Sequence, residues 1–126
     1  MPSFGTLKAD TLTHSTAGSV TTDNVVNGSA KAFSHFDGTS DTIKKSFNQS
    51  SLTDVGTGQY KQTYTNALSD AHQVVTTNGA RDSDQQVTNR FGDNATTHHQ
   101  VNSLANGTAT RQDTNTAMSV ALGDLA

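Results

Sequence analysis

The sequence predicts an all-β protein, an antiparallel β-sandwich or barrel-like domain with an extended N-terminal arm. Three observations lead to this prediction. Thr occurs 21 times and all 11 acidic residues are Asp, a composition that disfavours helices because Thr loses rotamer freedom there and Asp competes for backbone hydrogen bonds. Short segments of strand chemistry are separated by turn sequences at intervals of about 8–12 residues, as in sandwiches and barrels. The chain of 126 residues has the size of one small domain with a short arm.

Residues 1–29 are expected to form the arm. Nothing in them repeats at helical spacing, residues 19–22 have strand chemistry, and Asn27-Gly28 is a strong turn signal. Because the scattered apolar residues of this segment cannot form a core by themselves, we expect the arm to be anchored on another surface. The expected anchoring residues are Phe4, Leu7, Leu12, Val20, Val25 and Val26.

Residues 30–126 are expected to form the β-domain, and its first strands are the clearest. Residues 30–36 lead to Asp37-Gly38, a hairpin-type end, and residues 42–52 form a second strand that stops in the Gly-rich residues 54–58. Residues 60–64 alternate, which places Tyr60 and Tyr64 on one face of a strand.

The later strands are expected at similar spacing. Further strands cover residues 72–77, 86–91, 96–104 and 117–122, with turns at Asn78-Gly79, residues 92–94 and Asn106-Gly107 between them.

Large apolar residues are scarce. Leu, Ile, Val and Phe together number 22 of 126 residues, so an isolated chain buries little apolar surface. We therefore expect either partial disorder or a core that subunits share, as in a homotrimer. In the shared core, the strand faces with Phe33, Tyr60, Tyr64 and Val120 are expected to meet.

Charge and hydropathy argue against several partners. The net charge of −3 and the lack of a basic stripe predict no nucleic-acid partner. No run approaches the roughly 18 apolar residues needed for a membrane span, and the first residues lack the features of a signal peptide. We therefore expect a protein without membrane insertion, made in a cytoplasm, and the lack of Cys excludes disulfides.

Candidate metal ligands are few. His98 and His99 are adjacent, so in a strand they point to opposite faces and cannot chelate one ion together. His14, His35 and His72 have no partner at ligand spacing, and ordinary polar strand positions are expected for all five. One His per subunit on a threefold axis is the alternative. Asp82-Ser83-Asp84 resembles half of a calcium loop, but the chain has no Glu to complete it, so a solvated loop is expected.

Catalytic motifs are also missing from the sequence. It has no Gly-x-Ser-x-Gly elbow, no complete phosphate-binding loop, and no spacing that singles out a pair among the 11 Asp. We expect no enzymatic activity, no catalytic residues, no metal and no cofactor.

Four sequence segments resemble a known family. They are Ala-Lys-Ala-Phe-Ser-His-Phe-Asp-Gly-Thr (30–39), Lys-Ser-Phe-Asn-Gln-Ser-Ser-Leu-Thr-Asp-Val-Gly-Thr-Gly-Gln-Tyr (45–60), Thr-Asn-Ala-Leu-Ser-Asp-Ala-His (65–72) and Ser-Val-Ala-Leu-Gly-Asp-Leu-Ala (119–126). In order and spacing they resemble a β-domain that recurs in tailed bacteriophages, in tail-fibre, head-fibre and other virion surface proteins. Gln62 stands where that pattern has an apolar strand residue, and residues 80–116 match no part of it.

The resemblance implies a homotrimeric β-structured projection on a virion, made in the host cytoplasm, without cofactor or catalysis. Because only 29 residues precede the domain, we expect a capsid decoration, cement or head-fibre protein whose partners are its own copies and the major capsid protein or another virion protein. The alternative is a tail-fibre tip that binds a host-surface glycan. Tyr60, Tyr64 and Phe91 would then stack on sugar, although core positions are also expected for these aromatics. A polysaccharide hydrolase is a third reading, for which we expect no turnover.

Overall fold

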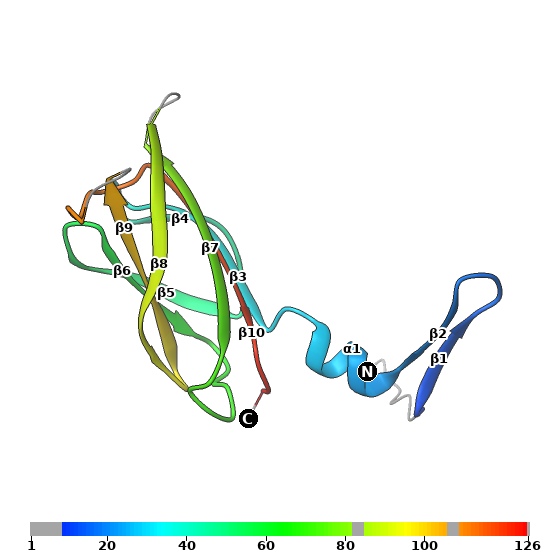
Figure 1. Cartoon of the computed structure of the whole chain (residues 1–126). Coiled ribbons are helices and arrows are strands. Elements are labelled where there is room, and N and C mark those ends of the chain that lie inside the picture. Colours follow the sequence, from blue (N-terminus) through cyan, green and yellow to red (C-terminus); the bar gives the residue numbers. More distant parts are fainter. Residues whose placement is uncertain (1–8, 82–84, 106–108, 126) are drawn as a thin grey trace, which may run out of the picture.

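The computed structural model describes residues 9–81, 85–105 and 109–125 of the chain. Ten strands and one helix lie within these residues, and the strand pairs are antiparallel (Figure 1). The prediction of an all-β, antiparallel protein is therefore confirmed. The elements are β1 Thr11–His14, β2 Gly18–Thr21, α1 Thr22–Gly28, β3 Ala32–Asp37, β4 Thr42–Phe47, β5 Gln49–Gly56, β6 Gln59–Tyr64, β7 Val74–Arg81, β8 Gln85–Ala95, β9 His98–Ala105 and β10 Thr116–Leu122.

Eight of these strands form one sheet in the order β4-β3-β10-β7-β8-β9-β6-β5. The sheet is folded so that its two halves face each other (Figure 1). Phe36 of β3 packs edge-on against Tyr60 of β6, with ring centroids 5.2 Å apart, and Ser119 of β10 contacts His99 of β9. Strands β7 and β8 connect the two layers on one side, and the link between β4 and β5 connects them on the other.

The interior contains two apolar clusters. One is formed by Phe36, Tyr60, Val101 and Ala117, and the other by Ala32, Tyr64, Leu68 and Ala121. The expected alternation of β6 is confirmed, because Tyr60 and Tyr64 are both buried while Lys61 and Thr63 are partly exposed. These tyrosines close a core, as expected, and the structure places that core within the single chain. Phe33 and Val120 lie on the opposite, outer face of β3 and β10.

Asn48 divides the strand expected over residues 42–52 into β4 and β5. It adopts a left-handed backbone conformation with φ of 53°, which turns the chain from one layer into the other. Its side-chain amide donates to the carbonyls of Lys31 and Asn66, each at 3.0 Å, and its Oδ1 accepts from the Asn66 N–H at 2.7 Å. Asn tolerates this conformation better than most residues, so this corner has a local chemical cause.

Three of the later strand ends differ from expectation. Asn78-Gly79 lies inside β7, where it pairs with Met118 and Ala117 of β10. Residues 92–94 lie inside β8, at an irregularity in its pairing with β9. The turn is instead at residues 96–97, and β9 begins at His98. Pairing with the distant strand β10 has overridden the local turn preference in β7, whereas the β8–β9 hairpin simply makes its turn a few residues later than expected. The turn expected at Asn106-Gly107 lies outside the described residues.

The N-terminal segment, residues 9–29 of the described chain, is not extended throughout. Its strands β1 and β2 form a hairpin, and residues 22–28 form helix α1, which ends at the Asn27-Gly28 pair expected as a turn. The Thr21 hydroxyl accepts a hydrogen bond from the Asn24 N–H at 3.3 Å and caps the helix. Two helical turns are too short for apolar periodicity to appear, which is why the sequence pattern missed them. The segment projects from the sheet (Figure 1).

Candidate functional site

The N-terminal segment exposes the anchoring residues that the structure describes. Leu12 and Val20 lie directly opposite each other across the β1–β2 hairpin, and both are exposed. Val25 and Val26 lie in α1, where Val26 has an exposed fraction of 58%. Phe4 and Leu7 lie outside the described residues. The structure thus brings four of the six residues together as two apolar pairs and buries neither pair.

The secondary structure of this segment is marginal by itself. Each strand of the hairpin has 4 residues and the helix has 7. Isolated two-stranded hairpins, and isolated helices shorter than about 12–15 residues, are barely stable in water. A surface that covered the exposed apolar pairs would therefore stabilise the segment as well as bind it.

Lys31 joins the segment to the sheet. Its ammonium donates to the backbone carbonyl of Val26 in the last turn of α1 and to Ser29 Oγ at 3.1 Å. A positive charge at this end favours the helix, because its last carbonyls are the negative end of the helix dipole. Lys31 is buried, and its backbone N–H donates to the Ala121 carbonyl at 2.9 Å. The helix therefore leaves the sheet from a fixed point.

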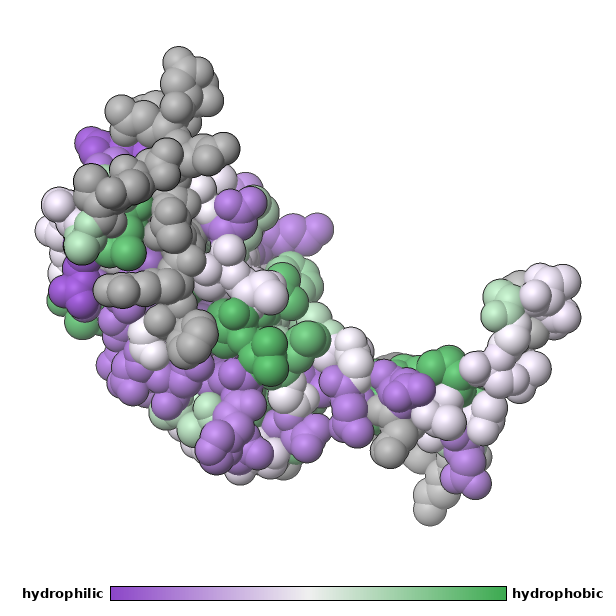
Figure 2. Space-filling view, viewed as in Figure 1, coloured by the Kyte–Doolittle hydropathy of each residue, from purple (hydrophilic) through white to green (hydrophobic). Residues whose placement is uncertain are grey.

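An apolar surface lies on the outer side of one layer, over β4, β3, β10 and β7. The rings of Phe33 and Phe47 stack with centroids 5.9 Å apart, and Val120 lies directly opposite Phe33. Phe47 and Val74 have exposed fractions of 53% and 61%. Figure 2 shows apolar side chains gathered on the side of the domain from which the N-terminal segment leaves. We call this surface the outer apolar face and define it by Phe33, Phe47, Val74, Met118, Val120 and Leu122.

The two apolar clusters of the interior are separated by buried polar side chains. His99 is completely buried, with Nδ1 2.8 Å from the Tyr64 hydroxyl and Nε2 3.0 Å from Ser119 Oγ. Ser119 Oγ also lies 3.0 Å from Gln62 Oε1, to which Ser34 Oγ donates a hydrogen bond. We call these four residues, His99, Gln62, Ser34 and Ser119, the polar layer.

The neighbours of His99 fix its tautomer. Gln73 Nε2 donates to the carbonyls of Ala95 and His98, so Gln73 Oε1 accepts from the Tyr64 hydroxyl. That hydroxyl has one proton, and its oxygen therefore accepts from His99 Nδ1–H. Nε2 therefore carries no proton and lies 3.0 Å from Ser119 Oγ, whose single proton is shared between Nε2 and Gln62 Oε1.

His99 is held neutral. Burial lowers its pKa to about 4, and the nearby His98 acts in the same direction. A serine hydroxyl on a histidine nitrogen is also the geometry of a nucleophile and its base. Here both side chains are enclosed between the sheet layers, where a substrate cannot reach them. The pair is best explained as packing, and sequence reasoning missed it because it placed every histidine at an ordinary polar strand position.

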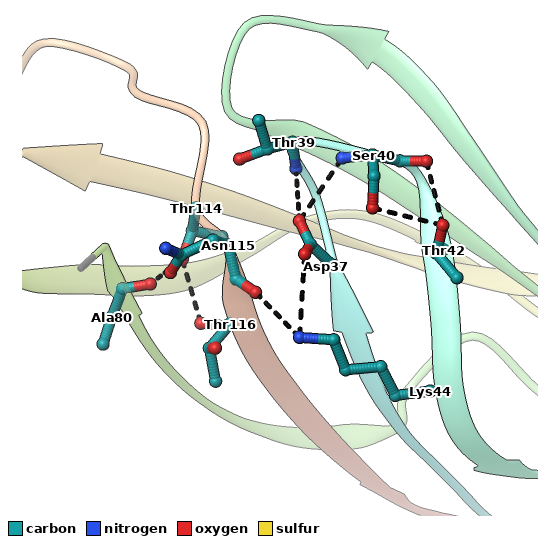
Figure 3. A network of polar contacts seen from close by, with 9 residues as sticks. All are labelled: Asp37, Thr39, Ser40, Thr42, Lys44, Ala80, Thr114, Asn115 and Thr116. Carbon is teal, nitrogen blue, oxygen red and sulfur yellow. Dashed lines mark hydrogen bonds and ion pairs between the residues drawn. The ribbon is translucent and has the colours of Figure 1, made fainter. Parts of the chain in front are cut away.

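At one end of the domain, Asp carboxylates accept hydrogen bonds from backbone N–H groups of the turns (Figure 3). Asp37 Oδ1 accepts from the N–H groups of Thr39 and Ser40, at 3.0 and 3.3 Å, in the turn between β3 and β4. Lys44 Nζ lies 3.6 Å from Asp37 Oδ2 and donates to the Asn115 carbonyl at 3.2 Å, which connects this turn to the residues before β10.

Asp113 plays the same part beside Tyr60. Its Oδ1 accepts from the Gly58 N–H at 2.7 Å and from the Tyr60 hydroxyl at 3.1 Å, and burial raises the pKa of Tyr60. Nearby, partial burial and then the negative charges of Asp54, Asp113 and Asp37 raise the pKa of Asp41. These acidic residues lie close together, but the carboxylates of Asp37 and Asp113 already accept hydrogen bonds from backbone N–H groups.

No group of three His or Asp side chains suited to a metal ion occurs in the described part of the chain. His98 and His99 lie on opposite faces of β9, as expected, since His98 is partly exposed and His99 is buried. The side chain of His14 and residues 82–84 lie outside the described part. The solvated loop expected at Asp82-Ser83-Asp84 therefore stays a prediction. In the same described ranges, no helix is long and apolar enough to cross a membrane.

Comparison with family models, with curated proteins and with solved structures finds no match to this chain. The assignment of function therefore depends on the residues and their geometry.

Proposed function

We infer that this protein is a non-enzymatic structural protein of a phage virion surface, a capsid decoration, cement or head-fibre protein. One observation carries the proposal: the N-terminal segment leaves a β-domain with its own core and exposes Leu12, Val20, Val25 and Val26. A domain with a separate, barely stable segment that exposes apolar residues is suited to being anchored through that segment. In this proposal the domain is a sandwich that faces outward, and copies assemble as a homotrimer.

The resemblance to phage surface domains is the second basis of the proposal, and the structure explains why two of its glycines are needed. Gly38, from the first matching segment, lies where an added Cβ would be 2.2 Å from the ring of Tyr60, which ends the second segment. Gly58, at φ +64°, lies where a Cβ would be 2.6 Å from the Ser103 carbonyl oxygen. The residues that carry the resemblance thus lie at tight contacts where few other residues fit.

The alternative, a tail-fibre tip that binds a host glycan, has lost part of its basis. Tyr60 and Tyr64 are buried in the core and are not available to stack on sugar. Phe91 lies in β8 at a position where the structure does not describe the side chain. We therefore keep the head location as the proposal.

Immunogold electron microscopy of the phage particles that would carry this protein tests the proposal directly. Antibody against this chain should label many positions over the head. Label confined to the tail would favour the receptor-binding alternative, and particles without label would refute a virion role.

The anchoring role needs its own experiment. Full-length Leu12→Asp and Val20→Asp chains, changed in the hairpin and not in α1, should bind particles that lack this protein at least about tenfold more weakly, because a charge buried at an apolar contact costs more than 1.4 kcal/mol. Val55→Asp, at an exposed valine of β5, is the matched control. Equal binding by all three variants would contradict anchoring through the segment.

A further inference from the structure

The outer apolar face and helix α1 are two apolar surfaces of one chain, and neither covers the other. On the face, Val74, Met118 and Val120 are exposed, and β7 and β10 border an open groove lined by Met118 and Val120. On the helix, Val25 and Val26 are exposed. Both surfaces are therefore available for a second molecule.

The chain's own helix is directed away from this face. Lys31 holds the last turn of α1 through the Val26 carbonyl, and Lys31 is itself fixed by hydrogen bonds from its N–H to Ala121 and from Asn48 to its carbonyl. With this junction intact, α1 projects beyond the sheet (Figure 1). The helix is thus presented to a neighbour.

The two surfaces match in size and in charge. A helix of 7 residues is about 10 Å long, and the distance across four neighbouring strands is about 14 Å. Asp10 lies at the start of α1, where the Thr22 N–H donates to its carbonyl at 2.9 Å, and Lys31 lies at the other end of the helix. On the face, Lys45 lies opposite His35, on the same side of the sheet as Phe33 and Phe47. The acidic start of the helix is thus complementary in charge to the basic border of the face.

We propose that helix α1 of one copy packs on the outer apolar face of a second copy. This exchange covers Val25 and Val26 together with Phe33, Met118 and Val120, whereas a face-to-face contact would leave the helix exposed. Repeated around a closed ring, it joins identical chains head to tail. The proposal goes beyond the virion role and does not depend on it, because it concerns contacts between copies of the chain alone.

The absence of Cys from the sequence permits a clean test. Full-length Val26→Cys and Val120→Cys chains would be co-expressed, one with a short mass tag, purified and oxidised. We expect a disulfide-linked product of twice 13.2 kDa that contains one chain of each kind. It should form about tenfold faster than the product from Val26→Cys with Val55→Cys, because thiols held in an interface have a raised effective concentration.

The other products would each overturn the proposal. Mainly Val120→Cys pairs would mean that two outer faces meet, and mainly Val26→Cys pairs would mean that two helices meet. A third chain that carries both Val26→Cys and Val120→Cys tests for contact within one copy. A disulfide inside that chain, at 13.2 kDa, would mean that α1 covers its own face. Rates equal to those of the Val55→Cys control would mean no contact. Because particles are not involved, failure here is distinguishable from failure of the virion role.

Discussion

Single buried residues show how a chain with few large apolar side chains closes a core. Gln62 stands where the resembling phage domains have an apolar residue, and it is buried with Oε1 bonded by Ser34. Its Nε2 has no hydrogen-bond partner within the described residues. A buried donor without a partner lowers the free energy of unfolding. His99 and Ser119 occupy the same layer. Polar side chains that hydrogen-bond one another thus take volume that the scarce apolar residues cannot fill.

His99 should make the protein sensitive to acid. Its pKa is about 4 in the folded chain and near 6.5 in the unfolded chain, so the unfolded chain binds more protons between these values. The contribution to folding is complete above about pH 6.5 and is lost as the pH falls through 4, a decrease of about 3 kcal/mol. Urea unfolding between about pH 7 and pH 4 measures it.

Two glutamine variants isolate the source of this effect. His72→Gln, at a side chain that is 94% exposed, should keep the pH dependence of the original chain. His99→Gln is less stable at neutral pH but should lose the decrease assigned to His99. The same slope with pH in both variants would contradict the assignment.

Gly38 gives a second prediction at a single residue. In Gly38→Ala the new Cβ would lie 2.2 Å from Cζ of the buried Tyr60 ring, so the ring or the turn must move. We expect a loss of about 1–3 kcal/mol in the free energy of unfolding. Gly28→Ala, where nothing lies within 4 Å, should change it by less than about 1 kcal/mol. Equal effects of the two substitutions would refute the packing argument.

The decisive element of the fold is the single-residue link between β4 and β5. Both edge strands of the eight-stranded sheet meet at Asn48, so the two layers are tied together where the sheet would otherwise open. The link is also joined to Lys31, which carries the N-terminal segment. A change at this corner therefore affects the closure of the sheet as well as a local turn.

Substitutions at Asn48 should separate conformation from hydrogen bonding. Asn48→Gly keeps the φ of 53° without strain but loses three side-chain hydrogen bonds, and we expect a loss of about 1–3 kcal/mol. Asn48→Ala loses the same bonds and adds strain, so its loss should be larger by about 1 kcal/mol. Thermal or urea unfolding ranks the pair, and the reverse order would show that the backbone conformation does not limit the corner.

The sequence predicts a feature of this fold well when neighbouring residues determine it, and poorly when contacts between distant strands do. The alternation of Tyr60 and Tyr64 and the separation of His98 from His99 followed from strand period alone. Asn78-Gly79 has the chemistry of a turn, but pairing with β10, nearly forty residues away, keeps it in a strand. The polar layer brings Ser34, Gln62 and Ser119 together from three strands, which no pattern along the chain reveals. The outer apolar face also combines residues of several strands, so the sequence predicts Phe33 and Val120 at a core and does not reveal an exposed face.

At the scale of the whole molecule, the expected assembly now has a different physical basis. The scarcity of large apolar residues predicts a core shared between chains, yet Tyr60, Tyr64 and Phe36 close one within a single chain. The reason to expect partners is instead the exposed apolar surface of the outer apolar face and the N-terminal segment. Assembly would then add stability to a domain that already folds.

We predict a mass of three times 13.2 kDa by light scattering at micromolar concentration, with a melting temperature that rises with concentration. Val120→Lys should shift the mass to that of one chain while circular dichroism still shows β-structure, because the substitution lies on the outer face. Lys61→Ala, on the other layer, is the control. A single-chain mass for the unaltered protein would refute assembly, and a dimer would refute the threefold form alone.

The polar layer has a consequence for the heat capacity of unfolding. Exposure of apolar surface raises this quantity and exposure of polar surface lowers it. Unfolding this domain exposes the buried polar side chains of Gln62, His99, Ser34 and Ser119 together with its apolar clusters. We expect a heat-capacity change below the usual value of about 12–15 cal/mol/K per residue, measured by calorimetry. The curve of stability against temperature would then be flatter than that of an average domain of this length.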